Sequence, residues 1–513
     1  MWLLKLINLA LLCFGLILES DSAKILGIFF VPSISHQIAY RPIWRELSIR
    51  GHNVTVISPN ILNDSSLTNL TEIDVSFAYD ILGKFDLQKN AAKENFLVKN
   101  FITIHNMMFS VMHAILEYGA VQDLIHSDEE FDLILVESLH PLVFSFGARF
   151  KAPIIAVSSI EVFVYIYDIF ANPTHPISNP DMMMYFEREP SFIERIRSLT
   201  HNVVSRLCYY WWILPQSDVL ARMYFGEDMP DLEKIISNTS LLLINRNPIM
   251  HSPRPNVPTI IEIGQMHIRE KKNLPEDLQT YLDSSEKGVV YFSLGSNIKS
   301  ANLSGGLQEI IKQALSELPF DIIWKWETEQ LPGKPDNVLI REWLPQQDIL
   351  GHPNVKVFVT QGGLQSLEEA VVNGVPMVGI PFWMDQFNNV KILADKEMGI
   401  GLNYNTMTKD ELRKAIFEVA TNSKFKKQLE KAKNILLDQP VTGLNKAIWW
   451  IEYVLRHKET THLRTPSADM SFFQYFMVDV FAFLLLSICI FVYLLKMAFR
   501  MIVGSKNNKI KTN

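Results

Sequence analysis

The sequence predicts an α/β protein in which two doubly wound, parallel-sheet domains precede a C-terminal helix that crosses a membrane. Residues 24–58 have the pattern strand, helix, strand, which is the βαβ unit of a parallel sheet. Later in the chain, the stretch from Trp343 to Gln386 has the pattern strand, glycine turn, helix. The 513 residues are enough for two domains and smaller attachments.

The composition is that of a globular protein with additional apolar segments. Hydrophobic residues make up 48% of the chain and charged residues 20%, and the formal net charge is −7. Nucleic-acid binding needs a concentrated positive patch, so no nucleic-acid partner is expected.

Residues 1–22 are predicted to be a signal peptide. Lys5 supplies the positive charge and Leu6–Leu18 form the apolar core. The small residues Ser20 and Ser22 suit a cleavage site. An uncleaved membrane anchor is the alternative, but the apolar run is short for a span, so cleavage is favoured.

The first domain is expected over residues 23–265. Its strands are continuous apolar runs, as expected where helices cover both faces of a parallel sheet. A helix is predicted from His36 to about Arg50. The predicted strands are Lys24–Val31, His52–Ser58, Phe131–Glu137, Ala152–Ser158 and, closing the domain, Leu241–Asn245.

Several segments between these strands are rich in aromatic residues and methionine. They are Phe96–Met112, Val162–Phe170 and Met182–Phe186. Methionine-rich surfaces adapt to ligands of varied shape, although such residues also fill ordinary cores. Ser198–Leu214 combines periodic apolar residues with clustered aromatic ones. It is predicted to lie either at a membrane interface or in the domain core, and both alternatives stay open.

The second domain is expected over residues 266–465. The proline-rich run Pro248–Pro258 and the polar run His267–Pro275 predict a linker before it. Its elements outside the central stretch are the strands Gly288–Leu294, Ile322–Lys325 and Asn337–Arg341 and the helices Leu307–Leu318, Lys409–Thr421, Phe425–Leu437 and Leu444–His457.

The central stretch predicts an anion site. After the strand Lys356–Val359, the turn Thr360–Gly363 brings bare backbone close to a ligand, and Ser366 is expected to open a helix. A helix start offers free N–H groups and a positive dipole end, which suit a diphosphate. Ser366 and Glu369 also fit a capping box that needs no ligand.

The residues after this helix return to the edge of the sheet. A second apolar strand ends at Pro381, and Asp385 and Gln386 follow it. Ligands of open α/β sheets bind at this edge, so both side chains are expected at the mouth of the site.

In order and spacing, the motif W-x-P-Q, T-x-G-G, Glu, G-V-P and D-Q resembles the donor-binding signature of the UDP-glycosyltransferases. The resemblance covers about 24–500. It implies a GT-B arrangement, with two Rossmann-like domains facing across a cleft and the last helix crossing back over the first domain. The family's His in T-H-G-G is Gln361 here.

The resemblance also implies roles at the donor site. Trp343 stacks on uracil, Gln346 hydrogen-bonds uridine, and Glu369 holds the ribose hydroxyls. Asp385 and Gln386 bind the sugar. The residues implied at the diphosphate are Ser296 in a second glycine turn, Gln361, Gly362, Gly363, Gln365 and Ser366.

His36 is the candidate general base. It follows the first strand at a helix start, which disfavours imidazolium, so the ring is expected to be neutral and able to accept a proton. Glu137 ends a strand at the same edge and could orient and stabilise the ring. The family usually has Asp at this place. A lone His after a strand is otherwise a structural residue.

The resemblance therefore implies inverting transfer of a hexose from a UDP-sugar to a hydroxyl of a small lipophilic acceptor. Insect members are most similar, which favours glucose, with glucuronic acid as the second donor. UDP-sugar is a co-substrate, and no metal or other cofactor is expected. The alternative is a catalytically impaired relative that binds lipophiles or pairs with active enzymes, and a homo- or hetero-oligomer stays open.

Phe472–Leu495 is long enough to cross a bilayer. The tail 496–513 is basic and has no acidic residue, so the positive-inside rule puts it in the cytosol and the bulk of the chain in the lumen. Lys509 and Lys511 resemble a dilysine retrieval signal, which implies the endoplasmic reticulum membrane. A plain basic flank is an equal alternative.

Cysteine usage predicts a lumenal part without an intramolecular disulfide, because Cys208 is its single cysteine. Asn53 heads an N-x-S/T sequon but enters a strand, so it is expected to stay bare. The candidate glycan sites are Asn63, Asn69, Asn238 and Asn302.

Overall fold

The computed structural model describes residues 22–85, 97–184, 186 and 189–510 of the chain. It divides the chain into two units, Met1–Leu463 and Arg464–Asn513. Nearly all of the predicted signal peptide, parts of the segments Phe96–Met112 and Met182–Phe186, and Lys511 lie outside the described residues.

The first sheet has seven parallel strands in the order β3-β2-β1-β4-β5-β6-β7. The five predicted strands are confirmed with slightly shorter bounds, and β3 and β7 are additional. β3 is half-exposed and β7 is short, so neither has a continuous apolar run. The strands are β1 Lys24–Ile28, β2 Asn53–Ser58, β3 Leu70–Asp74, β4 Leu133–Glu137, β5 Ile154–Ser158, β6 Leu241–Ile244 and β7 Ile260–Glu262.

Helices cover this sheet. α2 begins two residues before His36, with Ser33 as its N-cap, and places that histidine in its first turn. The helices of the first domain are α2 Ile34–Ile49, α3 Ala78–Gly83, α5 Leu97–Glu117, α6 Gly119–His126, α7 Ser145–Phe150, α8 Val164–Ile169, α9 Phe192–Cys208, α10 Leu214–Phe225 and α11 Leu232–Ser237, with a π-helical turn at Tyr209–Ile213.

The proline-rich run Pro248–Pro258 is not a linker between domains, so that prediction is wrong. It connects β6 to β7, which pair in parallel within the first sheet. Proline and glycine mark irregular backbone, but they do not tell a crossover inside a domain from a connection between domains.

The second sheet has six parallel strands in the order β10-β9-β8-β11-β12-β13. Its strands are β8 Val289–Ser293, β9 Asp321–Lys325, β10 Val338–Arg341, β11 Val355–Thr360, β12 Met377–Gly379 and β13 Gly399–Gly401. Its helices are α12 Glu276–Ser284, α13 Gly305–Ser316, α14 Gln346–Leu350, α15 Leu364–Asn373, α16 Gln386–Asp395, α17 Lys409–Thr421 and α18 Ser423–Leu437.

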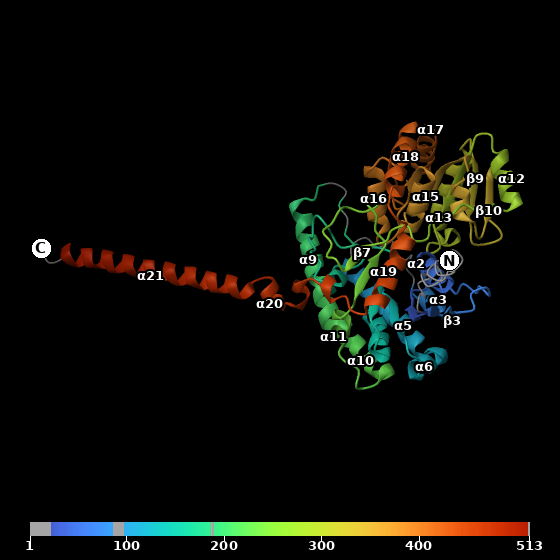
Figure 1. Cartoon of the computed structure of the whole chain (residues 1–513). Helices are drawn as coiled ribbons and strands as arrows, with labels where there is room; N and C mark the ends of the chain where they lie inside the picture. Colours follow the sequence, from blue (N-terminus) through green and yellow to red (C-terminus); the bar gives the residue numbers. More distant parts are fainter. Residues whose placement is uncertain (1–21, 86–96, 185, 187–188, 511–513) are drawn as a thin grey trace, which may run out of the picture. The chain divides into compact units, whose positions relative to one another are not determined.

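The last helix of the first unit returns to the first domain, as predicted. α19 spans Gly443–His457 and lies beside α2 in Figure 1. Its side chains Ala447, Ile448 and Ile451 are fully buried in a cluster with Tyr40 and Trp44 of α2. The contact fastens the end of the second domain to the back of the first sheet.

The second unit contains a helix that is long and apolar enough to cross a membrane. α20 is a short helix, Phe472–Tyr475, and α21 spans Val478–Ile510. The apolar part is Val478–Met501, 24 residues, which is about 36 Å of helix. The predicted start at Phe472 is therefore wrong. Met477 has a φ of 49°, which breaks the helix just before Val478.

Candidate active site

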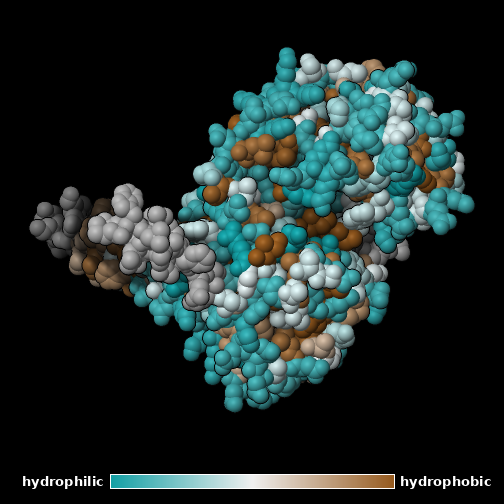
Figure 2. Space-filling model, turned by 45° about the vertical axis from the view of Figure 1, so that its right-hand side comes forward, coloured by the Kyte–Doolittle hydropathy of each residue, from teal (hydrophilic) through white to brown (hydrophobic). Residues whose placement is uncertain are grey.

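The two sheets meet at a cavity of about 400 Å³, a volume typical of small-molecule sites. Its walls come from both domains. Figure 2 shows hydrophobic side chains in the hollow between the two halves of the globular unit. The apolar wall supplied by the first domain includes Leu82, Ile104, Met107, Met108, Leu139, Ile160, Phe163 and Met182.

His36 and Glu137 meet at this cavity because their strands are neighbours. β1 and β4 pair in parallel, so the start of α2 and the end of β4 lie at the same edge. His36 Nδ1 is 2.9 Å from Glu137 Oε1. A carboxylate only accepts hydrogen bonds, so the ring proton lies on Nδ1 and Nε2 is the basic nitrogen. His36 also lines the cavity.

Glu137 is fully buried and held from three sides. Besides His36, it accepts hydrogen bonds from the Val31 backbone N–H (2.9 Å) and the Tyr40 hydroxyl (3.3 Å). Burial raises the pKa of Tyr40 well above its ordinary value, and the nearby Glu137 charge raises it further, so this hydroxyl keeps its proton. The Tyr40 oxygen in turn accepts from the Ser159 backbone N–H. The carboxylate at 137 is therefore preorganised next to the imidazole.

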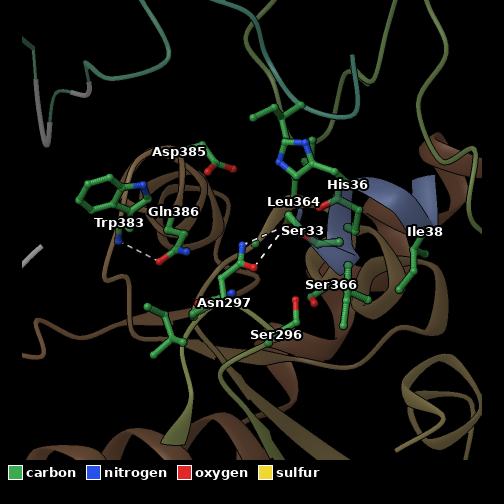
Figure 3. Close-up of a pocket in the computed structure, with 18 of the residues that line it drawn as sticks. Ser33, His36, Ile38, Ser296, Asn297, Leu364, Ser366, Trp383, Asp385 and Gln386 are labelled. Carbon is green, nitrogen blue, oxygen red and sulfur yellow. Dashed lines mark hydrogen bonds between the residues drawn. The ribbon is translucent and has the colours of Figure 1, made fainter. Parts of the chain in front are cut away.

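Asp385 and Gln386 come from the second domain, at the start of α16. Asp385 and His36 both line the cavity, as Figure 3 shows. Burial raises the pKa of Asp385 to about 6, while its hydrogen bond from Asn389 opposes the rise. The Gln386 side chain accepts from the backbone N–H groups of Phe382 and Trp383, which fixes it at the cavity wall.

Two glycine turns form the floor beneath α15. Gly295 has a φ of 77°, and a Cβ there would lie 2.4 Å from the Gln361 amide nitrogen, so this position needs glycine. Ser296, Gln361 and Gly363 line the cavity beside this contact. The side-chain amide oxygen of Gln361 is buried and has no hydrogen-bond partner among the described residues.

α15 does not begin at Ser366, so the predicted start and the capping box are both wrong. Gly363 is the N-cap, and Leu364 is the first helical residue. The chain enters the helix directly from the glycine turn, which puts Ser366 inside the first turn. Its hydroxyl accepts a hydrogen bond from Gln346 (2.9 Å) instead of capping the backbone.

Gln365 connects the two domains. Its side-chain amide donates to the Ser159 carbonyl (2.9 Å), and its own carbonyl lies 3.2 Å from His267 Nε2. It lines the cavity, but its amide donor already has a partner in the first domain. Its role at the diphosphate stays a prediction.

The other end of the cavity gathers the residues predicted for the nucleoside. Trp343 is 59% exposed, so one ring face is available to a base. Gln346 donates to Glu369 (2.6 Å) and accepts from the Tyr291 hydroxyl (3.1 Å). Burial raises the pKa of Glu369 to about 7, although the Gln346 hydrogen bond opposes the rise.

Sequence reasoning missed two contacts that join the domains beside the site. Asn297 exchanges hydrogen bonds with Ser33, the N-cap of α2, as Figure 3 shows. Glu368 is fully buried and accepts from Asn245 (3.2 Å) and Asn247 (2.7 Å). Burial raises the pKa of Glu368 to about 7. The sequence shows an acid at position 368, but it gives no indication of the two asparagine partners, which are over a hundred positions away.

Asp385 and Glu369 line the cavity, and Glu137 lies buried behind His36, but these acids do not form a metal cluster. Within the described ranges, no group of three or more His, Cys, Asp or Glu side chains is arranged to hold a metal ion.

Known relatives were found along nearly the whole chain. UDP-glucosyltransferase 2 of Dactylopius coccus is 31% identical over 512 residues, which cover 96% of this chain and 97% of the relative. Ecdysteroid UDP-glucosyltransferase of Spodoptera littoralis nuclear polyhedrosis virus is 30% identical, covering 92% and 95%. Human UDP-glucuronosyltransferase 2A3 is 29% identical, covering 91% of each chain.

Solved structures share the fold. The glycotransferase of kitacinnamycin superposes with a TM-score of 0.57 at 19% identity and covers 84% of this chain and 99% of its own. The glycosyltransferase VinC in complex with DTDP has a TM-score of 0.56 at 18% identity, covering 85% and 100%. At this identity the likeness establishes the GT-B fold alone.

The family model described as UDP-glucoronosyl and UDP-glucosyl transferase matches residues 24–511. That span contains both sheets, the cavity between them and the apolar C-terminal helix. The resemblance seen in the donor motif is thus confirmed over the whole chain. The chain belongs to the UDP-glucuronosyl and UDP-glucosyl transferase family and is a UDP-glycosyltransferase.

Proposed function

We propose that this enzyme transfers glucose from UDP-glucose to a hydroxyl group of a small lipophilic acceptor, with inversion at the anomeric carbon. The observation that carries the proposal is the His36–Glu137 pair, which faces the donor motif across one cavity. A base on one wall and a donor site on the other suit attack opposite the leaving group, and such attack inverts the centre.

In the proposed step, His36 Nε2 takes the proton of the acceptor hydroxyl as its oxygen forms a bond to the anomeric carbon. The bond from that carbon to the diphosphate oxygen breaks, and UDP leaves with the electron pair. Glu137 keeps Nδ1 protonated and stabilises the imidazolium that forms. The Glu137 carboxylate is buried and hydrogen-bonded from three sides, so its position needs to change little during the step.

The leaving diphosphate is proposed to lie over the start of α15 and the two glycine turns. Backbone N–H groups, the helix dipole and the Ser296 and Gln361 side chains would meet its charge. We infer that the chain's own donors provide this stabilisation without a metal ion or another cofactor. Retention of activity in excess chelator tests this inference.

The charges around the cavity favour a neutral sugar over a uronic acid. Two lysine or arginine side chains line the cavity among the described residues, Arg269 and Lys325. Arg269 pairs with Asp348 (2.6 Å) and Lys325 with Glu327 (3.0 Å). Both cations are thus already neutralised by acids, while Asp385 adds a carboxylate near the sugar position. A second carboxylate on the sugar would be repelled there.

The acceptor is proposed to enter along the apolar wall of the first domain. Ile104, Met107, Met108 and Phe163 lie on that wall, and flexible methionines adapt to varied shapes. The 30% identical viral relative is named for ecdysteroids, which supports a steroid-like acceptor among the candidates.

We also propose that the enzyme is a single-pass protein of the endoplasmic reticulum membrane with its catalytic domains in the lumen. The support is the apolar helix Val478–Met501 and the basic, acid-free tail behind it. Protease added to sealed microsomes should then remove only the tail. Digestion of the catalytic domains without detergent would overturn this topology.

The function is tested with the full chain in lipid nanodiscs, UDP-glucose or UDP-glucuronic acid, and a panel of phenols and steroids, read by mass spectrometry. Glucosides should form with UDP-glucose, and their rate of formation should fall by about two to four orders of magnitude in the His36→Ala variant. Binding of UDP-glucose without product on any acceptor, by wild type and variant alike, would favour the catalytically impaired relative.

A further inference from the structure

α9 is an amphipathic helix with its polarity reversed relative to a normal surface helix. The side chains it buries against the first domain are polar: Ser198, His201, Asn202 and Ser205. Its exposed side chains include Arg195, Arg197 and Thr200, but beside these an apolar stripe runs along the helix, with members mostly three or four residues apart. They are Phe192 (66% exposed), Ile193 (57%), Ile196 (45%), Leu199 (55%), Val203 (48%) and Leu207 (39%).

The buried side of α9 is held by hydrogen bonds and ion pairs. His201 Nε2 lies 3.0 Å from Asp181 Oδ1, and the Arg206 guanidinium pairs with Asp168 at 2.6 Å. Ser191 and Glu194 form a capping box at the start of the helix. These contacts fix which face points outward, so the apolar stripe does not arise from a loosely attached helix.

The stripe continues beyond the helix. In the π-helical turn that follows, Trp211 is 76% exposed and Tyr210 38% exposed, while Tyr209 turns inward and stacks on Tyr165. Figure 1 shows α9 at the outer edge of the globular unit. Monomeric soluble proteins rarely expose apolar surface in such a continuous row, so a partner is expected to cover it.

We propose that the apolar stripe of α9, Phe192 to Trp211, rests in the surface of a lipid bilayer as a second membrane contact of this enzyme. The chain carries its own membrane helix, Val478–Met501, joined to the globular unit through residues 464–477, which reach at most about 50 Å. A bilayer is therefore always within reach of the globular unit.

The chemistry of the stripe fits a bilayer surface. Aliphatic side chains occupy its length and Trp211 and Tyr210 its end, where amphipathic rings suit the headgroup boundary. The exposed Arg195 and Arg197 flank the stripe and can meet lipid phosphates. The contact would hold the first domain, which supplies the apolar cavity wall, against the membrane.

The test uses the full chain in phosphatidylcholine vesicles containing phosphatidylserine, with a protease site inserted after Met470. After cleavage, the wild-type globular unit should float with the vesicles. The triple variant Leu199→Glu, Val203→Glu, Leu207→Glu should lose at least about tenfold in bound fraction. The matched control Phe417→Glu, Ile435→Glu, Leu437→Glu changes similarly exposed residues of the second domain and should stay bound.

Melting temperature and UDP binding of both variants check their folding. A second readout needs no charged substitution: Leu199→Cys in the uncut chain, in a background without Cys208 and Cys489, carries a fluorescent probe. Lipid-borne spin labels should quench the probe, whereas a probe at Phe417→Cys should stay accessible to aqueous iodide.

Release of the wild-type unit on cleavage overturns the proposal. So does a probe at position 199 that is shielded from iodide but not quenched by lipid, because a second copy of the chain would then cover the stripe.

Discussion

Replacing Glu137 by Gln tests whether the carboxylate acts through His36. The substitution keeps the shape of the side chain but removes its charge from a fully buried site. At an effective dielectric constant of about 20, opposite charges about 4 Å apart attract by about 4 kcal/mol. Part of this attraction is lost when Gln retains a neutral hydrogen bond, so the transition state should lose about 2–4 kcal/mol. That is roughly a 30- to 1000-fold fall in kcat.

The assay is kcat for glucoside formation, with UDP binding measured by calorimetry. His36→Ala should lower kcat by about two to four orders of magnitude, the usual worth of a general base. UDP affinity should hardly change in either variant, because neither side chain belongs to the donor wall. Glu137→Asp keeps the charge and should retain more activity than Glu137→Gln. Melting temperatures separate catalytic loss from unfolding, since Val31 and Tyr40 also bond to this carboxylate.

The double variant decides the reasoning. If Glu137 acts only through the imidazole, adding Glu137→Gln to His36→Ala should cost almost nothing further. A full additional loss in the double variant would mean that Glu137 serves the reaction by another route. Near-normal turnover of His36→Ala would remove the base itself from the mechanism.

Four further outcomes are expected. Trp343→Ala should weaken UDP-glucose binding about 5- to 150-fold by calorimetry, the worth of about 1–3 kcal/mol for stacking one base; unchanged affinity would refute the stacking. Gln361→His should raise kcat/KM for the donor several-fold and Gln361→Ala should lower it, because a charge-assisted bond to phosphate exceeds a neutral one by about 1 kcal/mol; no effect of either would mean that this side chain does not face the diphosphate. Burial raises the pKa of Glu368 from 4.5 to about 7, so the folded protein holds a proton on this side chain more tightly than the unfolded chain does. The stability that this gives is fully present below pH 4.5 and is lost as the pH rises through about 7. Over this pH range the melting temperature of Glu368→Gln should therefore fall less than that of the wild type. The half-buried Asn69 side-chain amide donates to two backbone carbonyls at 2.8 and 2.7 Å, whereas the exposed Asn238 amide donates to one, that of Lys234 at 3.0 Å. Asn69→Gln should therefore leave electrophoretic mobility unchanged, while Asn238→Gln should remove a glycan.

The sequence was sufficient for the fold because parallel strands covered on both faces leave continuous apolar runs. β1, β4, β5 and β8 were all visible in this way. β3 was not, because its half-exposed sequence LTEID has no such run. The start of α15 was misplaced because S-x-x-E is a valid capping pattern, and the glycine turn before it acts as the true cap.

Contacts between the domains could not be predicted, for a physical reason. Local patterns report how a residue meets its neighbours along the chain, whereas Ser33 and Asn297 are 264 positions apart and Asn247 and Glu368 are 121 apart. Such pairs become visible only once both sheets are placed. The predicted donor residues lie near one another in the sequence, so a motif could identify them. Their contact partners in the first domain belong to no such motif.

Glu137 and Gln361 depart from the family pattern, and the two departures differ in how far they support the alternative of a catalytically impaired enzyme. Glu137 replaces a shorter acid, yet its carboxylate reaches His36 at 2.9 Å and is fixed by two other donors, so the extra methylene leaves the proposed base supported. Gln361 replaces a group that can carry charge, and its side-chain amide oxygen has no hydrogen-bond partner among the described residues. Backbone N–H groups and the α15 dipole do not depend on that side chain, so they would still hold the diphosphate. An impaired variant of this enzyme would therefore show its defect in the departure of UDP, with proton removal from the acceptor intact.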